Sequence, residues 1–154
     1  MMQAQMYYPT EMNIKKLTPT AKTPTRGSEE AAGYDLYADT DSMLMIKPHE
    51  TVKIPTGIAI QLPKGTFGAI FARSGLATKS GLRPANCVGV VDSDYRGDVT
   101  VALHNDTDIP KTIEAHERIA QLVVIPYLSL TLNEVDELDD TARGSDGFGS
   151  SGKL

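Results

Sequence analysis

Residues 88–103 read VGVVDSDYRGDVTVAL, and this stretch decides the fold class. Val88 to Val91 consists of glycine and β-branched residues, which is typical of a buried strand. Val99 to Leu103 alternates with a period of two, as a half-buried strand does. The polar residues between the two runs predict a hairpin turn that joins them.

The same pattern of short strands continues on both sides of this stretch. Glycine and proline recur between Pro19 and Pro126 and leave no room for a long helix. Short β-like runs lie between them, at residues 51–54, 57–62, 67–71, 86–91, 99–103 and 119–125. Many short strands at this spacing indicate an all-β sandwich or barrel. The exception is Ser74 to Ser80, where Ser74 is suited to cap one or two helical turns.

The composition fits one soluble domain and argues against nucleic acid and membranes as partners. A chain of 154 residues is long enough for one domain with a core. The net charge of −5 and the lack of a lysine or arginine cluster argue against nucleic-acid binding. Without a membrane-length apolar run or a signal-peptide pattern, the chain is expected to be cytoplasmic and to bind no membrane. Cys87 is the only cysteine and lies in an apolar run, which predicts a buried thiol in a reducing compartment.

The C-terminal residues differ in composition from the rest of the chain. Residues 134–140 are acidic, and residues 143–152 (RGSDGFGSSG) are mostly glycine and serine. Composition alone predicts a disordered tail. The alternative is a ligand-binding loop, because successive backbone amides can surround phosphate oxygens and Arg143 adds a charged fork. Phe148 in the same segment is able to stack on a planar ring.

The predicted turn contains more charged and reactive side chains than a turn requires. Asp92 directly follows the apolar strand, at the rim of the core that this strand joins. Partial desolvation there would make its carboxylate a better base. The alternative is a solvated turn in which Asp94 and Arg96 are surface charges, and for the turn taken alone this is the better interpretation.

Five segments require one explanation. They are AAGYDLYA at 31–38, RSGLA at 73–77, NCVGVVDSDYRG at 86–97, RIAQL at 118–122 and RGSDGFGSSG at 143–152. In this order and spacing they closely resemble the five motifs of the homotrimeric deoxyuridine triphosphatases, the dUTPases. Each motif alone is weak evidence, whereas the five together are highly specific.

The resemblance implies a fold, an assembly and an activity. The fold is a jelly-roll-like β-barrel over residues 13–135 with one short helix, in a homotrimer whose active sites combine residues of three subunits. Residues 1–12 are then a flexible N-terminal segment, and residues 136–154 a flexible glycine-rich arm that closes over a neighbouring subunit. The activity is Mg²⁺-dependent hydrolysis of dUTP to dUMP and pyrophosphate by water attack at the α-phosphorus. This reaction keeps uracil out of DNA and supplies dUMP for dTMP synthesis.

The third motif is expected to bind the nucleoside and to activate the water. The resemblance assigns Asp92 as the water-activating base and Tyr95 as the residue that packs on the deoxyribose. A ring against C2′ leaves no space for a 2′-hydroxyl, so ribonucleotides are excluded sterically. Asn86 matches the reader of uracil, because an amide offers both the donor and the acceptor that the uracil edge requires. Main-chain groups of Val90 and Val91 assist it.

The other motifs are expected to hold the triphosphate and the metal ion. Asp35 matches the acid that holds Mg²⁺ through water. Arg118 matches a structural arginine, for which we expect an internal ion pair. The remaining expected contacts to substrate are Arg73, Ser74, Gly75, Gln121, Arg143, Phe148, Gly149 and Ser150, with Phe148 over uracil and the others at the phosphates.

Two positions depart from the family pattern, and neither carries a proposed chemical role. Ala72 stands where many relatives have proline, and His116 stands where the family usually has a glycine-containing turn. If that turn requires positive φ, histidine is tolerated there but is not ideal. His49, His104 and His116 show no metal-ligand spacing, so we expect surface or structural roles for them.

Two other functions compete with dUTP hydrolysis. A dCTP deaminase shares the fold and the phosphate-binding turn, but the DSDYRG sequence and the phenylalanine-containing tail fit such enzymes poorly. A nucleotide-binding barrel that regulates a protein partner belongs to a different class, and the sequence permits this role in addition to hydrolysis.

Overall fold

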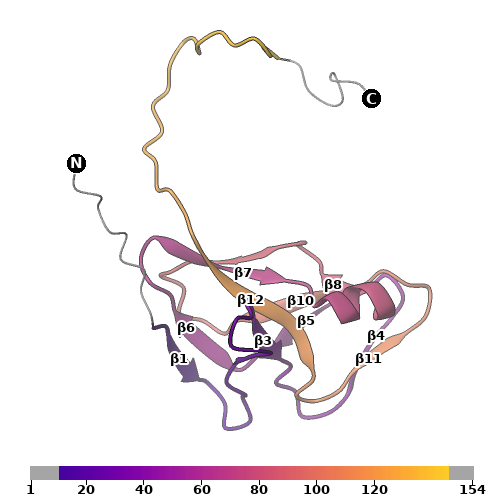
Figure 1. Cartoon of the computed structure of the whole chain (residues 1–154). Coiled ribbons are helices and arrows are strands. Elements are labelled where there is room, and N and C mark those ends of the chain that lie inside the picture. Colours follow the sequence, from indigo (N-terminus) through magenta and orange to yellow (C-terminus); the bar gives the residue numbers. More distant parts are fainter. Residues whose placement is uncertain (1–10, 146–154) are drawn as a thin grey trace.

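The computed structural model describes residues 11–145, and within them the regular structure consists of short antiparallel strands and one short helix. The strands are β1 (Asn13–Lys16), β2 (Thr25–Arg26), β3 (Tyr34–Tyr37), β4 (Leu44–Ile46), β5 (Thr51–Pro55), β6 (Ile58–Gln61), β7 (Thr66–Phe71), β8 (Leu82–Pro84), β9 (Gly89–Val91), β10 (Thr100–Asn105), β11 (Lys111–Ile113) and β12 (Arg118–Pro126). Figure 1 shows the strands wrapped around one core, with residues 127–145 extending away from it after β12.

The strands form four hydrogen-bonded groups. The largest is a five-stranded sheet in the order β2-β3-β12-β7-β9, and β5-β10-β8 is the next largest. Two pairs, β1-β6 and β11-β4, complete the barrel. The expected all-β, jelly-roll-like fold with one short helix is confirmed.

The alternation in sequence explains which side chains fill the barrel. In β10 the burial alternates residue by residue, with Val101, Leu103 and Asn105 inside and the residues between them more exposed. The central core combines aliphatic side chains from both sheets and from the loops between them. Its largest fully buried members include Leu36, Ile46, Ile54, Ile58, Leu103, Ile113, Ile119 and Leu122.

The predicted hairpin is wrong. β9 pairs with β7, whereas β10 pairs with β5 and β8, so the two strands on either side of the DSDYRG sequence belong to different sheets. Residues 92–99 therefore cross from one sheet to the other. We call residues 92–99 the crossover loop. Such a connection has polar groups near both sheets, whereas a hairpin tip would project beyond one of them.

Cys87 is exposed, which contradicts the predicted buried thiol. The backbone of Cys87 has a φ of 60°, and its amide donates to the carbonyl of Pro84 at 3.2 Å. A left-handed residue cannot continue an extended strand. The strand that was expected to begin at Asn86 therefore begins only at Gly89, and the residues before it form an exposed turn.

The only helix within residues 11–145 is short. It is the π-helix η1 (Leu76–Ser80), and Gly81 ends it with a φ of 68° and an amide that donates to the Leu76 carbonyl. The predicted serine cap is wrong, because Gly75 occupies the N-cap position and no side chain caps the helix. The Thr78 hydroxyl instead donates to the Ser74 carbonyl at 2.6 Å.

His116 adopts the conformation that its position requires. Its φ of 62° lies in the left-handed region, and its amide donates to the Ala38 carbonyl at 2.9 Å. The turn thus requires a positive φ, which glycine would adopt at lower conformational cost. Within the described residues no group of histidine, cysteine and acidic side chains is arranged to hold a metal ion.

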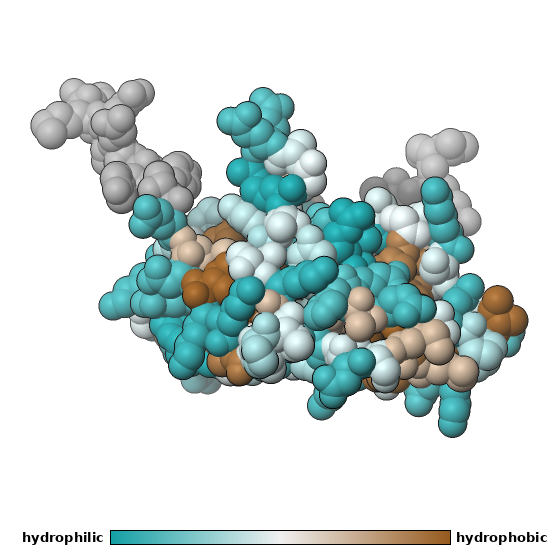
Figure 2. Space-filling view, turned by 90° about the horizontal axis from the view of Figure 1, so that it is seen from below, coloured by the Kyte–Doolittle hydropathy of each residue, from teal (hydrophilic) through white to brown (hydrophobic). Residues whose placement is uncertain are grey.

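The face of the barrel shown in Figure 2 is largely hydrophilic, and its apolar residues lie in separate small groups. Among residues 11–145, no helix has the length and apolar character needed to cross a membrane.

Candidate active site

A pocket of about 240 Å³ lies between β7, β9, β10 and the crossover loop. The five residues that the sequence assigned to base, sugar and water all line it: Asn86, Val90, Val91, Asp92 and Tyr95. Ile70 and residues of β10 form the remaining walls. The structure therefore brings the predicted nucleoside-binding residues together, and we call this space the nucleoside pocket.

The turn before β9 sets the position of Asn86. The amide of Val88 donates to the Asn86 carbonyl at 2.6 Å, which closes a tight turn. A Cβ atom on Gly89 would lie 3.4 Å from Asn86 Nδ2 and 3.1 Å from the Cβ of Ile70. The Asn86 amide therefore lies beside Gly89 at the start of β9, and the tighter of the two contacts would be the one with Ile70.

Tyr95 folds back over the end of the crossover loop. Its hydroxyl donates to the main-chain carbonyl of Asp98 at 3.1 Å. A Cβ atom on Gly97 would lie 2.4 Å from the Tyr95 hydroxyl oxygen, which is closer than atoms can approach. The ring can therefore take this orientation only because residue 97 has no side chain. Tyr95 remains 47% exposed and forms an open side of the nucleoside pocket.

Asp92 is exposed in the single chain, which contradicts the expected partial desolvation. Its main-chain carbonyl accepts a hydrogen bond from the Tyr95 amide at 3.2 Å, so the loop fixes its backbone. The carboxylate lies where β9 has ended, and no other element within residues 11–145 buries it. Residues 11–145 of a single chain therefore do not supply the desolvation that was expected for Asp92.

Asp98 also lines the nucleoside pocket, although no motif in the sequence marks it as a site residue. Its Oδ1 accepts a hydrogen bond from the Gly57 amide at 3.1 Å. Burial raises the pKa of Asp98 above its ordinary value of 3.8, and hydrogen bonds from the backbone of residues 56–58 oppose the rise. An acidic residue directly after a glycine and before a buried strand was the only signal in the sequence.

The raised pKa of Asp98 predicts a pH-dependent stability difference. The unfolded chain ionises Asp98 near 3.8, whereas the folded chain retains the proton to higher pH. Folding stability therefore falls as the pH rises from about 3.8 through the folded pKa. Asp98→Asn has no such ionisation. The free energy of unfolding of this variant, relative to that of the wild type, should therefore increase as the pH rises across this range. Urea unfolding at a series of pH values measures this difference, and a difference that is constant with pH would contradict the assignment.

A second pocket, of about 220 Å³, gathers most of the predicted phosphate-binding residues. It is lined by Gly27, Ala31, Gly33, Asp35, Arg73, Ser74, Gly75 and Gln121. Asp35 and Gln121 come from the paired strands β3 and β12, and they face each other in the register. The other predicted residues come from the turn between β7 and η1. We call this space the phosphate pocket.

Asp35 holds two arginines at the edge of the phosphate pocket. Its Oδ1 accepts from Arg73 Nε at 3.0 Å and its Oδ2 from Arg118 Nη1 at 3.1 Å. The carboxylate side chain is 15% exposed, against 28% for Arg73 and 49% for Arg118. The expected internal ion pair of Arg118 is present. Asp35 thus neutralises part of the arginine charge and fixes the direction of Arg73, which also donates to the Arg118 carbonyl at 3.1 Å.

Gln121 is fixed from two sides. Its Nε2 donates to the Ala72 carbonyl at 3.0 Å, next to the turn that carries Arg73. A Cβ atom on Gly33 would lie 2.4 Å from Gln121 Oε1, so glycine is required for the amide to lie where it does. The sequence identified Gln121 as an unusual polar residue in an apolar strand, but it gave no sign of the contact with Gly33.

Gly33→Ala should therefore weaken binding of the expected substrate, dUTP. The added methyl group displaces the Gln121 amide and breaks its bond to Ala72, a loss of about one hydrogen bond, or roughly fivefold to tenfold in KM. Gly27→Ala is the matched control, because a Cβ atom there would meet nothing within 4 Å in the same pocket. Steady-state kinetics on both variants checks this, and equal KM values for the two would contradict it.

The two pockets share no lining residue and lie far apart in one chain. Asp35 is level with Phe71 across the sheet, whereas Asp92, the residue after Val91, is level with Phe67. Three strand spacings of about 4.8 Å and four residues of about 3.4 Å separate the two acids, which gives about 20 Å. A single chain therefore does not assemble both pockets around one α-phosphate.

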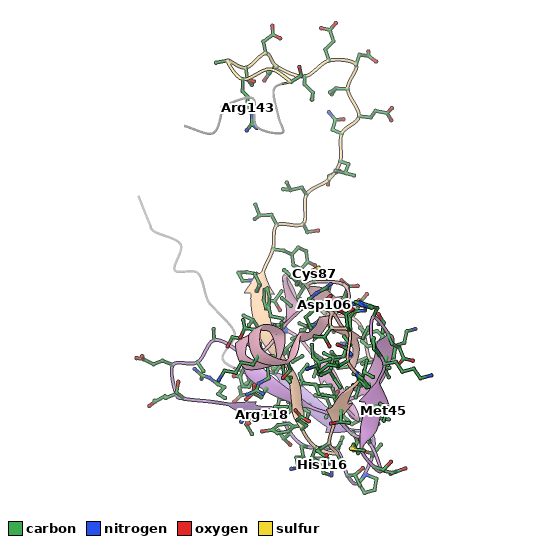
Figure 3. All side chains as sticks on the ribbon, turned by 90° about the vertical axis from the view of Figure 1, so that its right-hand side faces the viewer. Met45, Cys87, Asp106, His116, Arg118 and Arg143 are labelled. Atoms are coloured by element: carbon green, nitrogen blue, oxygen red, sulfur yellow. The ribbon has the colours of Figure 1, made fainter. Side chains whose placement is uncertain are left out.

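Residues 127–145 follow β12 as an exposed segment without helix or strand. Figure 3 shows Arg143 far from the labelled residues of the barrel. Near it, the Gly144 amide donates to the Thr141 carbonyl at 3.1 Å. This chain does not bring Arg143 to either of its own pockets. Phe148, Gly149 and Ser150 lie outside the described residues.

The donor set around Asp35 fits a magnesium ion only through water. Each carboxylate oxygen already accepts a hydrogen bond from an arginine. No acidic, histidine or cysteine cluster within residues 11–145 offers further ligands. Magnesium commonly keeps several waters and takes its remaining ligands from phosphates, so such an outer contact is compatible with its chemistry.

Comparison with known proteins identifies the family. The family model for dUTPase matches residues 20–152. The chain is 50% identical over 132 residues to the deoxyuridine 5′-triphosphate nucleotidohydrolase of Desulfitobacterium hafniense, covering 85% of this chain and 87% of that protein. It is 45% identical over 139 residues to the protein of the same name from Paramecium bursaria Chlorella virus 1, covering 90% and 96%.

A solved structure agrees with the sequence relatives. The dUTPase of Staphylococcus bacteriophage 80alpha, determined with dUPNHPP, superposes with a TM-score of 0.85 at 29% identity. The match covers 94% of this chain and 99% of the phage chain. The sequence, the fold and the family model thus agree, and the chain belongs to the dUTPase family.

Proposed function

We propose that this chain hydrolyses dUTP to dUMP and pyrophosphate, with Asp92 activating the water that attacks the α-phosphorus. The observation that carries the proposal is the division of polar groups between two pockets. One pocket combines an amide, a tyrosine ring and a carboxylate, and the other combines an arginine, a glutamine and a glycine-containing turn. These sets suit a nucleoside and a triphosphate respectively.

The nucleoside pocket provides recognition and the base. Asn86 and the main chain at Val90 and Val91 pair with the uracil edge, where cytosine would leave polar groups unpaired. The Tyr95 ring lies against the deoxyribose. Asp92 then orients the water and takes its proton, and pyrophosphate leaves the α-phosphorus.

The phosphate pocket provides charge and orientation. Arg73 donates to phosphate oxygens with the guanidinium N–H groups that Asp35 and the Arg118 carbonyl leave free, and Gln121, Ser74 and Gly75 add neutral donors. A bound magnesium ion would screen the phosphate charge, and Asp35 would accept hydrogen bonds from its waters. Arg118 acts through Asp35 as a structural partner.

We infer that the two pockets meet between subunits of a homotrimer. Alternation along β7, β9 and β12 places five apolar side chains, each exposed or partly exposed, on the same outer face as Asp35 and Gln121. They are Phe67, Phe71, Val90, Val123 and Ile125, and Val90 is 63% exposed in the single chain. An apolar sheet face beside two half-sites supports subunit packing there.

We assign the C-terminal arm, residues 136–154, as a lid supplied by a third subunit, and residues 1–12 as a separate N-terminal segment. Arg143 would reach the terminal phosphate, Gly149 and Ser150 other phosphate oxygens, and Phe148 the uracil ring. Closure of such a segment would exclude competing water and complete the site. We place the activity in the cytoplasm, because the substrate belongs to the deoxynucleotide pool and a single cysteine fits a reducing compartment.

A product assay tests the proposed function against its alternatives. The protein is incubated with each deoxynucleoside triphosphate and Mg²⁺, and pyrophosphate and ammonia are measured. We expect pyrophosphate from dUTP alone. Ammonia from dCTP would indicate a deaminase, and retained dUTP binding without either product would favour a regulatory binding protein.

A further inference from the structure

The end of the crossover loop is clamped to the turn between β5 and β6. The Gly57 amide donates to Asp98 Oδ1 at 3.1 Å, and the Val99 amide donates to the Ile58 carbonyl at 2.9 Å. The buried hydroxyl of Thr56 donates to the Val99 carbonyl at 2.5 Å. We call these three hydrogen bonds the clamp. Within the described residues, Asp98 is the only residue of the crossover loop whose side chain takes part in it.

Gly57 is adapted to the clamp. Its φ of 65° lies in the left-handed region, its amide donates to Asp98, and its carbonyl accepts from the Leu17 amide at 2.7 Å. A Cβ atom there would lie 2.2 Å from Asp39 Oδ2. The β5–β6 turn is therefore held from several directions, and it provides a rigid support for the carboxylate of Asp98.

The same residue holds Tyr95 through its main chain. The Asp98 carbonyl accepts the Tyr95 hydroxyl at 3.1 Å, and Gly97 leaves the space in which the ring lies. The side chain of Asp98 thus connects the rigid turn to the loop, and its carbonyl connects the loop to the ring. Asp98 and Tyr95 line the same nucleoside pocket.

We propose that Asp98 is a positioning residue for sugar selection, which sets the Tyr95 ring at the depth that admits a deoxyribose and rejects a ribose. This inference rests on the proposed function of the nucleoside pocket. To exclude the 2′-hydroxyl of a ribose sterically, the Tyr95 ring must keep its position, because a small displacement away from the sugar would make room for one oxygen atom. A tyrosine on a loop that is free to move would yield, whereas a ring tied to the β5–β6 turn does not.

Binding of dUMP and UMP tests the proposal, because these ligands report sugar selection without requiring hydrolysis. Titration calorimetry gives the ratio of the two Kd values for the wild type, Asp98→Ala, Asp98→Asn and Asp94→Ala. Asp94 is the matched control, an exposed acid in the same loop. Thermal unfolding of each variant is recorded alongside.

We expect Asp98→Ala to lower the preference for dUMP by about fivefold to tenfold, the loss of one anchoring hydrogen bond. Asp98→Asn keeps an oxygen acceptor for Gly57 and should retain most of the preference, and Asp94→Ala should retain all of it. An unchanged preference in Asp98→Ala overturns the proposal, as does an equal loss in Asp94→Ala. If Asp98→Ala does not fold, Tyr95→Phe decides, since it removes the bond to the Asp98 carbonyl and should show the same loss.

The test of sugar selection can fail independently of the test of dUTP hydrolysis. A wild-type protein that binds dUMP selectively but does not hydrolyse dUTP would refute hydrolysis and leave sugar selection open to this test. A wild-type protein that binds dUMP and UMP equally would refute the positioning role directly, whatever its activity.

Discussion

Asp92→Asn will retain dUTP binding and lower kcat by about 10²- to 10⁴-fold, the usual contribution of a general base. Asparagine has nearly the same shape as aspartate but cannot accept a proton from water. The Asp92 carboxylate makes no hydrogen bond or ion pair within residues 11–145, so the substitution leaves the fold unchanged. Rapid-quench kinetics gives the chemical step, and equilibrium titration with a non-hydrolysable dUTP analogue gives the binding.

Asp94→Asn is the control for this experiment. Asp94 is two residues away in the same exposed loop and receives no chemical role. It should show the wild-type kcat. An unimpaired rate in Asp92→Asn, or an equal loss in both variants, would remove Asp92 from its assigned role.

Truncation after Ala142 will lower kcat by about 10²-fold or more and leave the trimer intact. The deleted residues carry Arg143 and the glycine–serine segment, which we assign to closing the site over the phosphates. The barrel strands end at Pro126 and lie within the retained residues, so we expect their packing to be kept. Steady-state kinetics measures the loss, and light scattering after size-exclusion chromatography measures the assembly.

Truncation after Gly152 is the matched control, because it removes only the last two residues beyond the fifth motif. It should be fully active. If truncation after Ala142 were also fully active, the lid assignment would fail and the interpretation as a disordered tail would stand.

The sequence predicted the fold class because the strand signal is local. Alternation and β-branched residues mark strands such as β10 and β12 without reference to other parts of the chain. The pairing of those strands is not local. The run at Gly89–Val91 and the strand at Thr100–Asn105 are close in sequence, yet each pairs with a more distant partner, and only the packed core determines this.

The sequence predicted the residues of the site that belong to the family motifs, but not the residues that hold them in place. Motif resemblance identified Asn86, Asp92 and Tyr95, and the structure places all three at one pocket. It did not reveal Asp98 or Gly33, whose importance lies in what they contact. The clamp on Gly57 and the space beside Gln121 depend on residues that are distant in sequence, so no local pattern marks them.

Hydrolysis of dUTP in water labelled with ¹⁸O shows which phosphorus atom the water attacks. Attack at the α-phosphorus places the new oxygen on dUMP, and mass spectrometry of the separated products locates it. We predict one ¹⁸O atom in dUMP and none in the released pyrophosphate. Label in pyrophosphate with unlabelled dUMP would show attack at the β-phosphorus and contradict the account.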